Sequence, residues 1–341
     1  MSEPLHNPAA PTGVVSYDAH EDEHSRELAR HTHQVSSICF SPNGRLLVTA
    51  SNDEITGVGE VRLWDVERHK ELRFMRGHSS RISAVRFSRD GRAVASAGHD
   101  GTVRLWNISD GRELLRIWAH FGRVYDIDFS PGGEQIASGG QDQRVRVWNA
   151  HTGERLTELP GANAASIGHV YSVAFAEEGR LLAAGAEDGH LHVWELGKRG
   201  HERFDIRGHW GIVESLAWSP GAHLLASAGS DYNIRMWDTR TGERHAILQG
   251  HSDAVTCLAF SPDGDLLASA GADRTLRLWY GATGHQALVV EELPHEIYAL
   301  SFSPDGRSLV AGTWNRKTGG ERPASALRLW QVSELLAKFG T

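Results

Sequence analysis

The sequence has few cysteines, no long apolar run and no excess of basic residues. The only cysteines among its 341 residues are Cys39 and Cys257, which form no spaced pair. This excludes a disulfide framework and a cysteine-based zinc site, and it favours a reducing compartment. No segment approaches the roughly 18 apolar residues of a membrane-spanning helix, and no cationic start followed by an apolar run marks a secretory signal. The net charge of −8 leaves no basic field for nucleic acid or acidic lipid. We therefore expect a cytoplasmic protein that contacts neither nucleic acid nor membrane directly.

What the sequence does contain is a repeat. Short segments around a tryptophan recur along the chain, among them GTVRLWN (101–107), QRVRVWN (143–149) and RTLRLWY (274–280). Successive tryptophans of these segments are 42, 42, 46, 43, 42 and 51 residues apart. They are Trp64, Trp106, Trp148, Trp194, Trp237, Trp279 and Trp330. A period of this length indicates one supersecondary unit repeated seven times.

Each unit has the pattern of four short strands joined by turns. In the sixth unit the runs AVTCLAF, DLLASAG, TLRLW and HQALVV are separated by SPDG, ADRT and GATG, which are rich in turn-forming residues. Seven such units without helical periodicity predict an all-β protein, a seven-bladed β-propeller with four antiparallel strands per blade. We expect one domain over residues 21–341, preceded by a flexible tail over residues 1–20.

The N-terminal segment indicates how the ring closes. HSRELAR (24–30) is similar to DGRELLRIWA (110–119), the fourth strand of the second unit, yet it belongs to no complete unit of its own. The seventh unit has almost no chain after Trp330 to form a fourth strand. The sequence therefore predicts that residues near 24–30 supply the outer strand of the last blade.

The recurring dipeptides carry a family resemblance. Gly-His opens units at Gly77-His78, Gly208-His209 and Gly250-His251, and Trp-Asp closes units at Trp64-Asp65 and Trp237-Asp238. With these pairs in register over residues 21–335, the chain resembles a WD40-repeat (beta-transducin-like) protein. The resemblance implies a propeller closed by an N-terminal strand and a role in protein–protein interaction.

Histidine, serine and aspartate recur together with the tryptophan, and the first three are the side chains of a hydrolase triad. A triad is built once per active site, whereas this set occurs four times at the blade period. The resemblance to WD40 proteins implies a hydrogen-bond chain within each blade, so we predict structural tetrads and no catalytic residues. The sets are His78, Ser96, Asp100, Trp106; His120, Ser138, Asp142, Trp148; His209, Ser227, Asp231, Trp237; and His251, Ser269, Asp273, Trp279.

Two further patterns have structural interpretations. HEDEH (20–24) fits the H-E-x-x-H zinc motif, but that mechanism needs a helix in a cleft and a third ligand, so we interpret it as part of a solvated tail. Arginine stands two residues before the tryptophan in six units. Because this position lies within the third strand of each unit, we interpret these arginines as packing along the blades.

The loops offer a candidate partner surface. In the resembling family, the loops before the first strand and between the second and third strands of each blade meet on the face where partners bind. Exposed aromatic residues beside arginines have the composition of a binding hot spot. The predicted partner-binding residues are Arg81, His99, Phe121, Arg123, Gln141, His169, Trp210 and Tyr232. We expect protein or peptide partners, including an acidic or phosphorylated segment, and a monomeric propeller.

The leading hypothesis is thus a non-enzymatic scaffold, acting as a subunit, adaptor or inhibitor in a larger assembly. The alternative is a propeller hydrolase or a lactonase-like enzyme that uses the central channel. Such an enzyme needs converging histidines and carboxylates on the innermost strands. The innermost runs offer Asp126, Asp128 and Glu214 but no histidine. We therefore predict neither a metal ion nor a cofactor.

Overall fold

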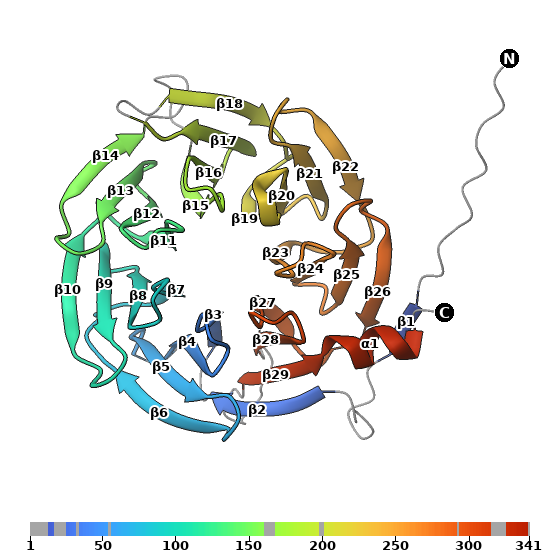
Figure 1. Cartoon of the computed structure of the whole chain (residues 1–341), viewed down its shortest axis with the longest axis horizontal. Coiled ribbons are helices and arrows are strands. Elements are labelled where there is room, and N and C mark those ends of the chain that lie inside the picture. The colour runs from blue at the N-terminus through green and yellow to red at the C-terminus, as the bar shows by residue number, and fades with distance from the viewer. Residues whose placement is uncertain are drawn as a thin grey trace, which may run out of the picture.

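Seven four-stranded units surround a central channel in the computed structural model (Figure 1). It describes residues 13–16, 25–31, 34–53, 56–159, 168–197, 201–291, 293–314 and 325–339. Neighbouring strands of each unit pair antiparallel, as the alternation of short apolar runs and turns predicts. The predicted seven-bladed, all-β propeller is confirmed.

The first four blades run from the channel outward in chain order. Blade one comprises β3 (Gln34–Phe40), β4 (Leu46–Asn52), β5 (Gly59–Asp65) and β6 (Lys70–Met75); blade two comprises β7 (Ile82–Phe87), β8 (Ala93–Gly98), β9 (Thr102–Asn107) and β10 (Glu113–Trp118). Blade three comprises β11 (Val124–Phe129), β12 (Gln135–Gly140), β13 (Val145–Asn149) and β14 (Arg155–Leu159); blade four comprises β15 (Val170–Phe175), β16 (Leu181–Ala186), β17 (His190–Glu195) and β18 (His201–Arg207).

The remaining blades follow the same order, with additions from both ends of the chain. Blade five comprises β19 (Val213–Trp218), β20 (Leu224–Gly229), β21 (Ile234–Asp238) and β22 (Arg244–Leu248), with a short 3-10 helix at Pro220–Ala222. Blade six comprises β23 (Val255–Phe260), β24 (Leu266–Gly271), β25 (Leu276–Tyr280) and β26 (Gln286–Glu291). Blade seven comprises β27 (Glu296–Phe302), β28 (Ser308–Trp314), β29 (Ser325–Gln331) and β2 (Ser25–His31).

The predicted closure of the ring is confirmed. Strand β2 pairs antiparallel with β29, so the blue N-terminal strand and the red C-terminal strand lie side by side in one sheet (Figure 1). Leu28 of β2 is 4% exposed and packs in a core cluster with Leu327 of blade seven and with Val35 and Leu47 of blade one. One N-terminal strand therefore completes blade seven and also seals it against blade one.

The chain ends add two elements that the sequence analysis did not predict. Gly13–Ser16, placed within a flexible tail over residues 1–20, forms β1, which pairs in parallel with β26 as a fifth strand of blade six. The outer edge of a blade leaves backbone donors and acceptors unpaired, and a segment with two adjacent valines suits that edge. The helix α1 (Val332–Phe339) follows β29 and buries Val332 and Leu335 in the core shared by blades six and seven (Figure 1). No helix in the described ranges is long and apolar enough to cross a membrane.

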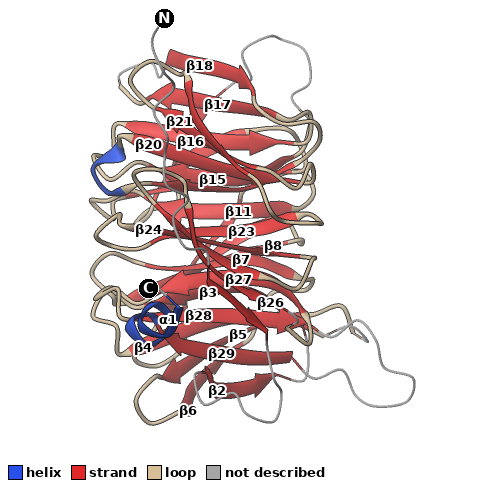
Figure 2. Ribbon diagram, turned by 90° about the vertical axis from the view of Figure 1, so that its right-hand side faces the viewer, coloured by secondary structure: helices blue, strands red, loops and turns tan. Residues whose placement is uncertain are grey.

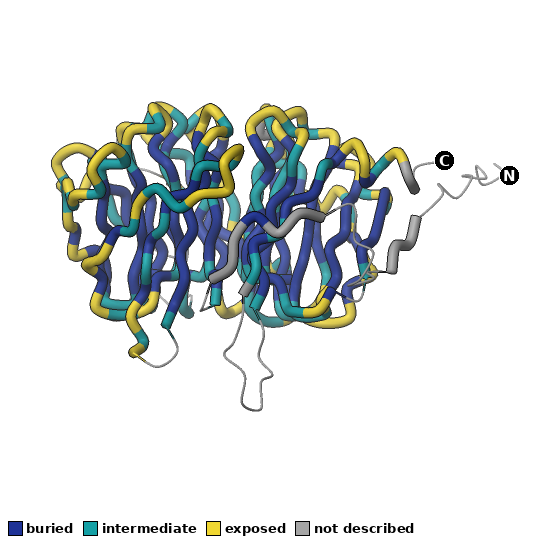
Figure 3. Tube along the Cα trace, turned by 90° about the horizontal axis from the view of Figure 1, so that it is seen from below, coloured by how far each residue is buried: buried dark blue, intermediate teal, exposed yellow. Residues whose placement is uncertain are grey.

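The core lies between blades, and the loops lie at the two faces. Buried residues follow the strands, whereas exposed residues gather at both ends of the short cylinder (Figure 3). In the side view of Figure 2 the blades lie side by side. Each cluster of buried apolar side chains joins two neighbouring blades, as where Ile117 of blade two meets Val124 and Trp148 of blade three. Because every blade uses its neighbours as its core, the ring presents its loops on a rigid scaffold.

Each innermost strand carries a β-bulge that directs one side chain toward the channel. The register of all seven inner pairs shifts around the second or third residue of the inner strand, as between Val124 and Asp126 in blade three. A bulge leaves one residue unpaired and re-aims it. The residues so placed are Ser36, Ser83, Tyr125, Tyr171, Glu214, Thr256 and Tyr298, and all line a channel cavity of about 390 Å³.

The small bulge residues join adjacent blades. The hydroxyl groups of Ser36, Ser83 and Thr256 donate to Ile82, Val124 and Ile297 carbonyl oxygens of the next blade at 2.7, 2.7 and 2.6 Å. In blades three to five the same place holds Tyr125, Tyr171 and Glu214. At this position the channel wall therefore has small hydroxyl side chains in blades one, two and six. It has aromatic or acidic side chains in blades three, four, five and seven, with Tyr298 in blade seven.

Blade four lacks part of the hydrogen-bond chain that blades two, three, five and six share. Ala184 takes the place of the tetrad serine, and the buried Trp194 Nε1 has no hydrogen-bond partner in the described part of the chain. We expect Ala184→Ser to raise the free energy of unfolding by about 1 kcal/mol, the net value of one buried hydrogen bond. Urea denaturation would measure this, with Ala183→Ser as the matched control. Ala183 is equally buried and belongs to the opposite core cluster, so its new hydroxyl group should destabilise. Equal effects of the two variants would contradict the assignment.

Candidate functional site: a partner face on blades two to five

The four predicted tetrads form the same hydrogen-bond chain in four blades. The Trp indole N–H donates to the Ser Oγ at 2.8–2.9 Å, and the Ser Oγ lies 2.7–2.8 Å from the His Nε2. The His Nδ1 lies 2.6–3.0 Å from the Asp carboxylate. Because the Asp carboxylate can only accept, the His Nδ1–H donates to it. The His Nε2 then accepts from the Ser O–H, and the same Ser oxygen accepts from the Trp N–H. Every buried polar group of these four tetrads is thereby paired.

The tetrad aspartate also fixes the loop that leads into the inner strand of its own blade. In blade three Asp142 Oδ2 accepts from the Phe121 N–H at 3.1 Å, and in blade five Asp231 Oδ2 accepts from the Trp210 N–H at 3.1 Å. The same bond holds Ser79 and Ser252 in blades two and six. The residue after the tetrad histidine is thus anchored through its backbone while its side chain stays free. Blades three and five use this position for large aromatic side chains.

Those aromatic side chains are exposed as the sequence predicts. Phe121 is 91% exposed and Trp210 is 79% exposed, and Tyr232 is exposed in a turn with a positive φ of 68°. The Arg207 guanidinium lies over the Trp210 ring at 5.2 Å. Burying such rings on binding would remove a large apolar area from water, which is how interface anchors act.

All eight predicted partner residues lie at one end of the blades. Five of them lie directly before an inner strand or in the loop that leads to it, and three lie in the loop between the second and third strands of a blade. Because neighbouring strands run antiparallel, these two loops lie at the same end of the blade. Backbone bonds join the two loops of a blade: the His99 N–H donates to the Arg81 carbonyl at 2.7 Å, and the Gln141 N–H to the Arg123 carbonyl at 2.8 Å. We call this surface the partner face, made of Arg81, His99, Phe121, Arg123, Gln141, His169, Trp210 and Tyr232.

A cluster of rings joins part of the partner face. Tyr125 stacks on Tyr171 with ring centroids 4.6 Å apart, and it contacts His99 at 5.8 Å and His169 at 5.9 Å. The structure therefore brings His99 and His169 together from blades two and four. In the described residues, no ring contact links Trp210 or Tyr232 to this cluster, so the face has two separate aromatic regions.

The two arginines beside the cluster carry its charge. Arg81 and Arg123 are exposed and form no ion pair within the described ranges. Burial, together with the charges of Arg123 and Arg81, lowers the pKa of His99 to about 4. His99 is therefore uncharged at neutral pH. The ring cluster therefore has two permanent positive charges, those of Arg81 and Arg123, beside its aromatic side chains.

Three residues of this surface were not among the predicted partner residues. Tyr125 and Tyr171 are the bulge residues that hold the ring cluster, and the signal was the tyrosine in second place of VYDIDF and VYSVAF. Trp118, the last residue of β10, is 75% exposed only three residues before Phe121. A tryptophan at the end of an outer strand has no further blade to pack on.

The arginines two residues before each tryptophan are structural where the tetrad is complete. Arg104, Arg146, Arg235 and Arg277 are buried. Arg146 Nη1 lies 2.6 Å from Asp142 Oδ2, and Arg235 Nη1 lies 2.8 Å from Asp231 Oδ2. Arg104, Arg146 and Arg235 therefore pair with the tetrad carboxylates of their blades, whereas Arg277 donates to Thr275 and Gln286. Because all four are buried, they do not form a nucleic-acid patch. The HEDEH segment (20–24) lies outside the described residues.

The channel does not have the arrangement that the enzyme alternative requires. No histidine lines its 390 Å³ cavity. Asp126 is held by the Arg86 guanidinium at 3.1 Å and accepts from the Val173 N–H at 3.0 Å, so its oxygens are engaged in structure. Burial raises the pKa of the neighbouring Asp128 to about 6, although the charge of Arg86 opposes this. The enzyme alternative has no support in this geometry.

Comparison with known proteins agrees with the blade count. The family model described as "WD domain, G-beta repeat" matches seven regions, at residues 22–55, 69–107, 111–149, 161–195, 200–238, 242–280 and 288–318. The chain belongs to the WD40-repeat family. A similar protein is the WD repeat-containing protein AAC3 of Dictyostelium discoideum, 44% identical over 43 residues. That stretch is 12% of this chain and 9% of the relative, about the length of one blade.

Membership of the WD40-repeat family is consistent with a protein-interaction scaffold. WD40 propellers typically bind other proteins and are generally non-enzymatic scaffolds. Because family membership fixes the scaffold and not the partner, the partner must be argued from the residues that the repeat leaves variable.

Proposed function

We propose that this WD40 protein is a non-enzymatic scaffold that binds a protein or peptide through the partner face on blades two to five. The observation that supports this most directly is the pair Phe121 and Trp210, which are large, exposed and fixed in place by tetrad aspartates. The matching position in blade six is Ser252. A monomeric soluble protein has no structural use for such anchored, exposed rings, whereas an interface does.

The charge of the partner face favours an acidic or phosphorylated segment. The charges of Arg81 and Arg123 both act on the uncharged His99. The guanidinium fork binds carboxylate or phosphate in pairs of hydrogen bonds. Glu187 limits this field at blade four, where its carboxylate lies 3.4 Å from His169. The segment should therefore place its acidic groups over blades two and three and its apolar residues toward blade five. Cytoplasmic location is part of the same proposal, supported by two free cysteines.

The test compares matched alanine variants. Proteins co-purifying with the wild type from native cells would be identified by mass spectrometry, and affinity would then be measured with the purified partner. Trp210→Ala and Arg123→Ala should each weaken binding by about 2 kcal/mol, close to thirtyfold. The control is Ser252→Ala, at the equivalent place in blade six, which should bind as the wild type does. Unchanged affinity of the first two variants, with all three folded, would move the binding site elsewhere.

The partner face should also make binding dependent on pH. The carboxylates of a bound glutamate-rich peptide would raise the pKa of His99 from about 4, so the complex takes up a proton. Affinity for that peptide should therefore rise as the pH falls from 7 to 5. Calorimetric titration at both pH values would measure the change, and His99→Gln should remove it while keeping both arginines. A pH effect equal in wild type and His99→Gln would contradict this role.

A further inference from the structure

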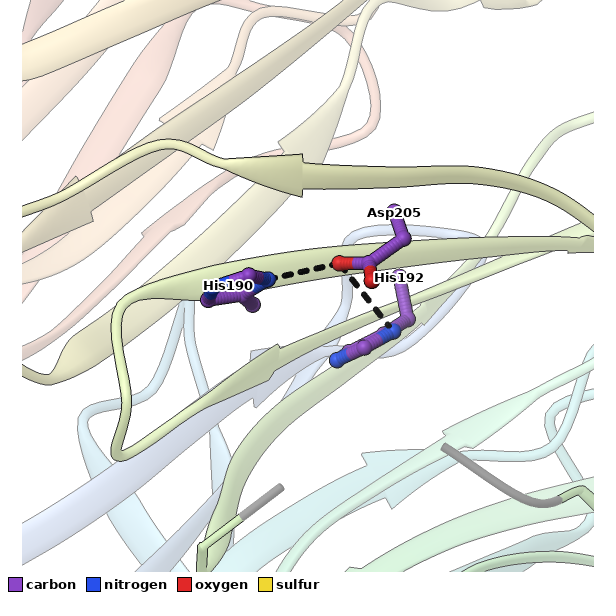
Figure 4. Close-up of side chains that lie close together, drawn as sticks. All are labelled: His190, His192 and Asp205. Carbon is purple, nitrogen blue, oxygen red and sulfur yellow. Dashed lines mark hydrogen bonds and ion pairs between the residues drawn. The ribbon is translucent and has the colours of Figure 1, made fainter. Parts of the chain in front are cut away.

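Blade four replaces the arginine of its third strand with a histidine and adds a second histidine two residues earlier. His190 and His192 lie on β17, and residues two apart on a strand point to the same side. His192 is directly opposite Asp205 of β18 in the strand register. A bulge between Phe204 and Glu202 brings the Glu202 carboxylate to the same group of side chains. Figure 4 shows the two imidazoles directed at one Asp205 oxygen.

The ligating atoms of these residues converge. His190 Nδ1 lies 2.6 Å and His192 Nδ1 lies 3.8 Å from Asp205 Oδ1, and all three atoms lie within 4.8 Å of one another. On its other side, His192 Nδ1 lies 2.7 Å from Glu202 Oε1. Donors around a tetrahedral Zn²⁺ with bonds of about 2.0–2.2 Å are roughly 3.3–3.6 Å apart. Small side-chain rotations would therefore bring two nitrogens and two oxygens to one ion.

Blade four also lacks the cation that other blades hold at this place. In blades one to three the arginine two residues before the tryptophan pairs with an outer-strand glutamate, as Arg104 Nη1 pairs with Glu113 at 2.7 Å. Glu202 and Asp205 have no arginine or lysine partner in the described part of the chain. The only cationic partners open to these two carboxylates there are the imidazoles themselves. A divalent ion would supply the missing positive charge.

The environment of the cluster suits a bound ion. His192 is 1% exposed, so its side chain is held at the buried end of the cluster. His190, Glu202 and Asp205 are partly exposed to solvent, so an ion can reach the cluster from that side. Imidazole nitrogens combined with carboxylates suit a borderline metal of the zinc type, whereas Ca²⁺ and Mg²⁺ prefer oxygen ligands alone. Among the described residues this is the one group of three such side chains close enough to share an ion, and it lies outside the channel.

We propose that blade four binds one zinc-type divalent ion through His190, His192 and Asp205, with Glu202 as the fourth donor. The ion replaces the protons that now bridge imidazole and carboxylate, and it cross-links β17 to β18. It thereby takes the place that the arginine–glutamate pair has in other blades. This site was not predicted from the sequence, for which neither a metal ion nor a cofactor was expected. It does not depend on the proposed partner face.

The test is calorimetric titration of the chelator-treated full chain with Zn²⁺. We expect one tight site that raises the melting temperature and weakens as the pH falls from 7.5 to 5.5, because the ligands must lose their protons. His190→Ala and Asp205→Asn should each lower the affinity about tenfold or more, since even residues behind the ligands cost that much. Co²⁺ in place of Zn²⁺ would report tetrahedral coordination by its absorption bands in wild type and lose them in both variants.

Two controls separate this site from other histidines. His201 lies on the same strand β18, is 74% exposed and faces Glu195 at 3.7 Å, so His201→Ala should leave the affinity unchanged. The double variant His20→Ala, His24→Ala removes the HEDEH histidines and should do the same. Zinc binding that is absent in wild type, or that persists at full affinity in folded His190→Ala and Asp205→Asn, would show that these side chains form hydrogen bonds only and would overturn the proposal.

Discussion

Deletion of residues 1–31 is expected to unfold the propeller or to lower its melting temperature far more than any other truncation of this end. The deletion removes β2, whose six paired positions with β29 complete blade seven, and it removes Leu28 from the core between blades seven and one. Loss of one buried leucine side chain alone costs about 2–5 kcal/mol, and a whole domain is stable by only about 5–15 kcal/mol. Opening the ring should therefore consume most of its stability.

Two milder variants make the expectation quantitative. Deletion of residues 1–24 removes β1 but keeps β2, so we expect a small loss from four edge pairings with β26. Leu28→Ala keeps the strand and empties its core position, so it should fall between the two deletions. Thermal and urea unfolding of the three variants would establish the order. Equal stability of the 1–24 and 1–31 deletions would show that β2 does not close the ring.

The repeat explains what could be predicted from the sequence. Seven blades could be predicted because the Trp residues and the turn residues between apolar runs recur at a steady period. The closure could be predicted because one N-terminal run matches the fourth strand of a unit but belongs to no unit of its own. β1 and α1 occur once, so no repetition marks them. They form because the edge of β26 and the apolar core behind it accept any segment of suitable pattern.

The candidate site was predictable only in part. Phe121 and Trp210 could be identified because the same position holds a serine in two other complete blades, Ser79 in blade two and Ser252 in blade six. Tyr125 and Tyr171 could not be placed beside His99 and His169, because a β-bulge in each inner strand decides where they point. The cluster of His190 with Asp205 depends on strand register between β17 and β18, which the spacing of motifs does not determine.

The second large effect is expected for Asp142→Ala in blade three. One carboxylate oxygen of Asp142 accepts from His120 at 2.6 Å, and the other accepts from Arg146 at 2.6 Å and from the Phe121 N–H at 3.1 Å. Alanine would leave a buried guanidinium and a buried imidazole without their anion. Removing one partner of such a pair costs about 3–5 kcal/mol. The Phe121 loop loses its anchor in the same step, so partner binding should weaken together with stability.

Blade four contains the matched control for this substitution. Asp188 holds the same place in the repeat, but it is exposed, and its carboxylate accepts a hydrogen bond from the His190 N–H at 3.0 Å. Asp188→Ala should therefore cost about 1 kcal/mol or less, the value of one exposed turn bond. If Asp142→Ala and Asp188→Ala have equal effects in urea denaturation, the tetrad is not what makes Asp142 important.

Acid titration tests the same carboxylate through its charge. Burial alone would raise the pKa of Asp142, but the hydrogen bonds and charges of His120 and Arg146 lower it to about 2, against about 3.8 when unfolded. Between these values the unfolded chain binds a proton that the folded chain does not. The stability that Asp142 contributes is therefore complete above about pH 4 and is lost as the pH falls through 2.

The pKa values of Asp100, Asp231 and Asp273 are lowered in the same direction, so the free energy of unfolding should fall steeply below pH 4. Asp142→Asn, which keeps one acceptor oxygen without the charge, should make that slope shallower between pH 4 and pH 3. A slope identical to that of the wild type would mean that Asp142 is not ionised when the chain folds.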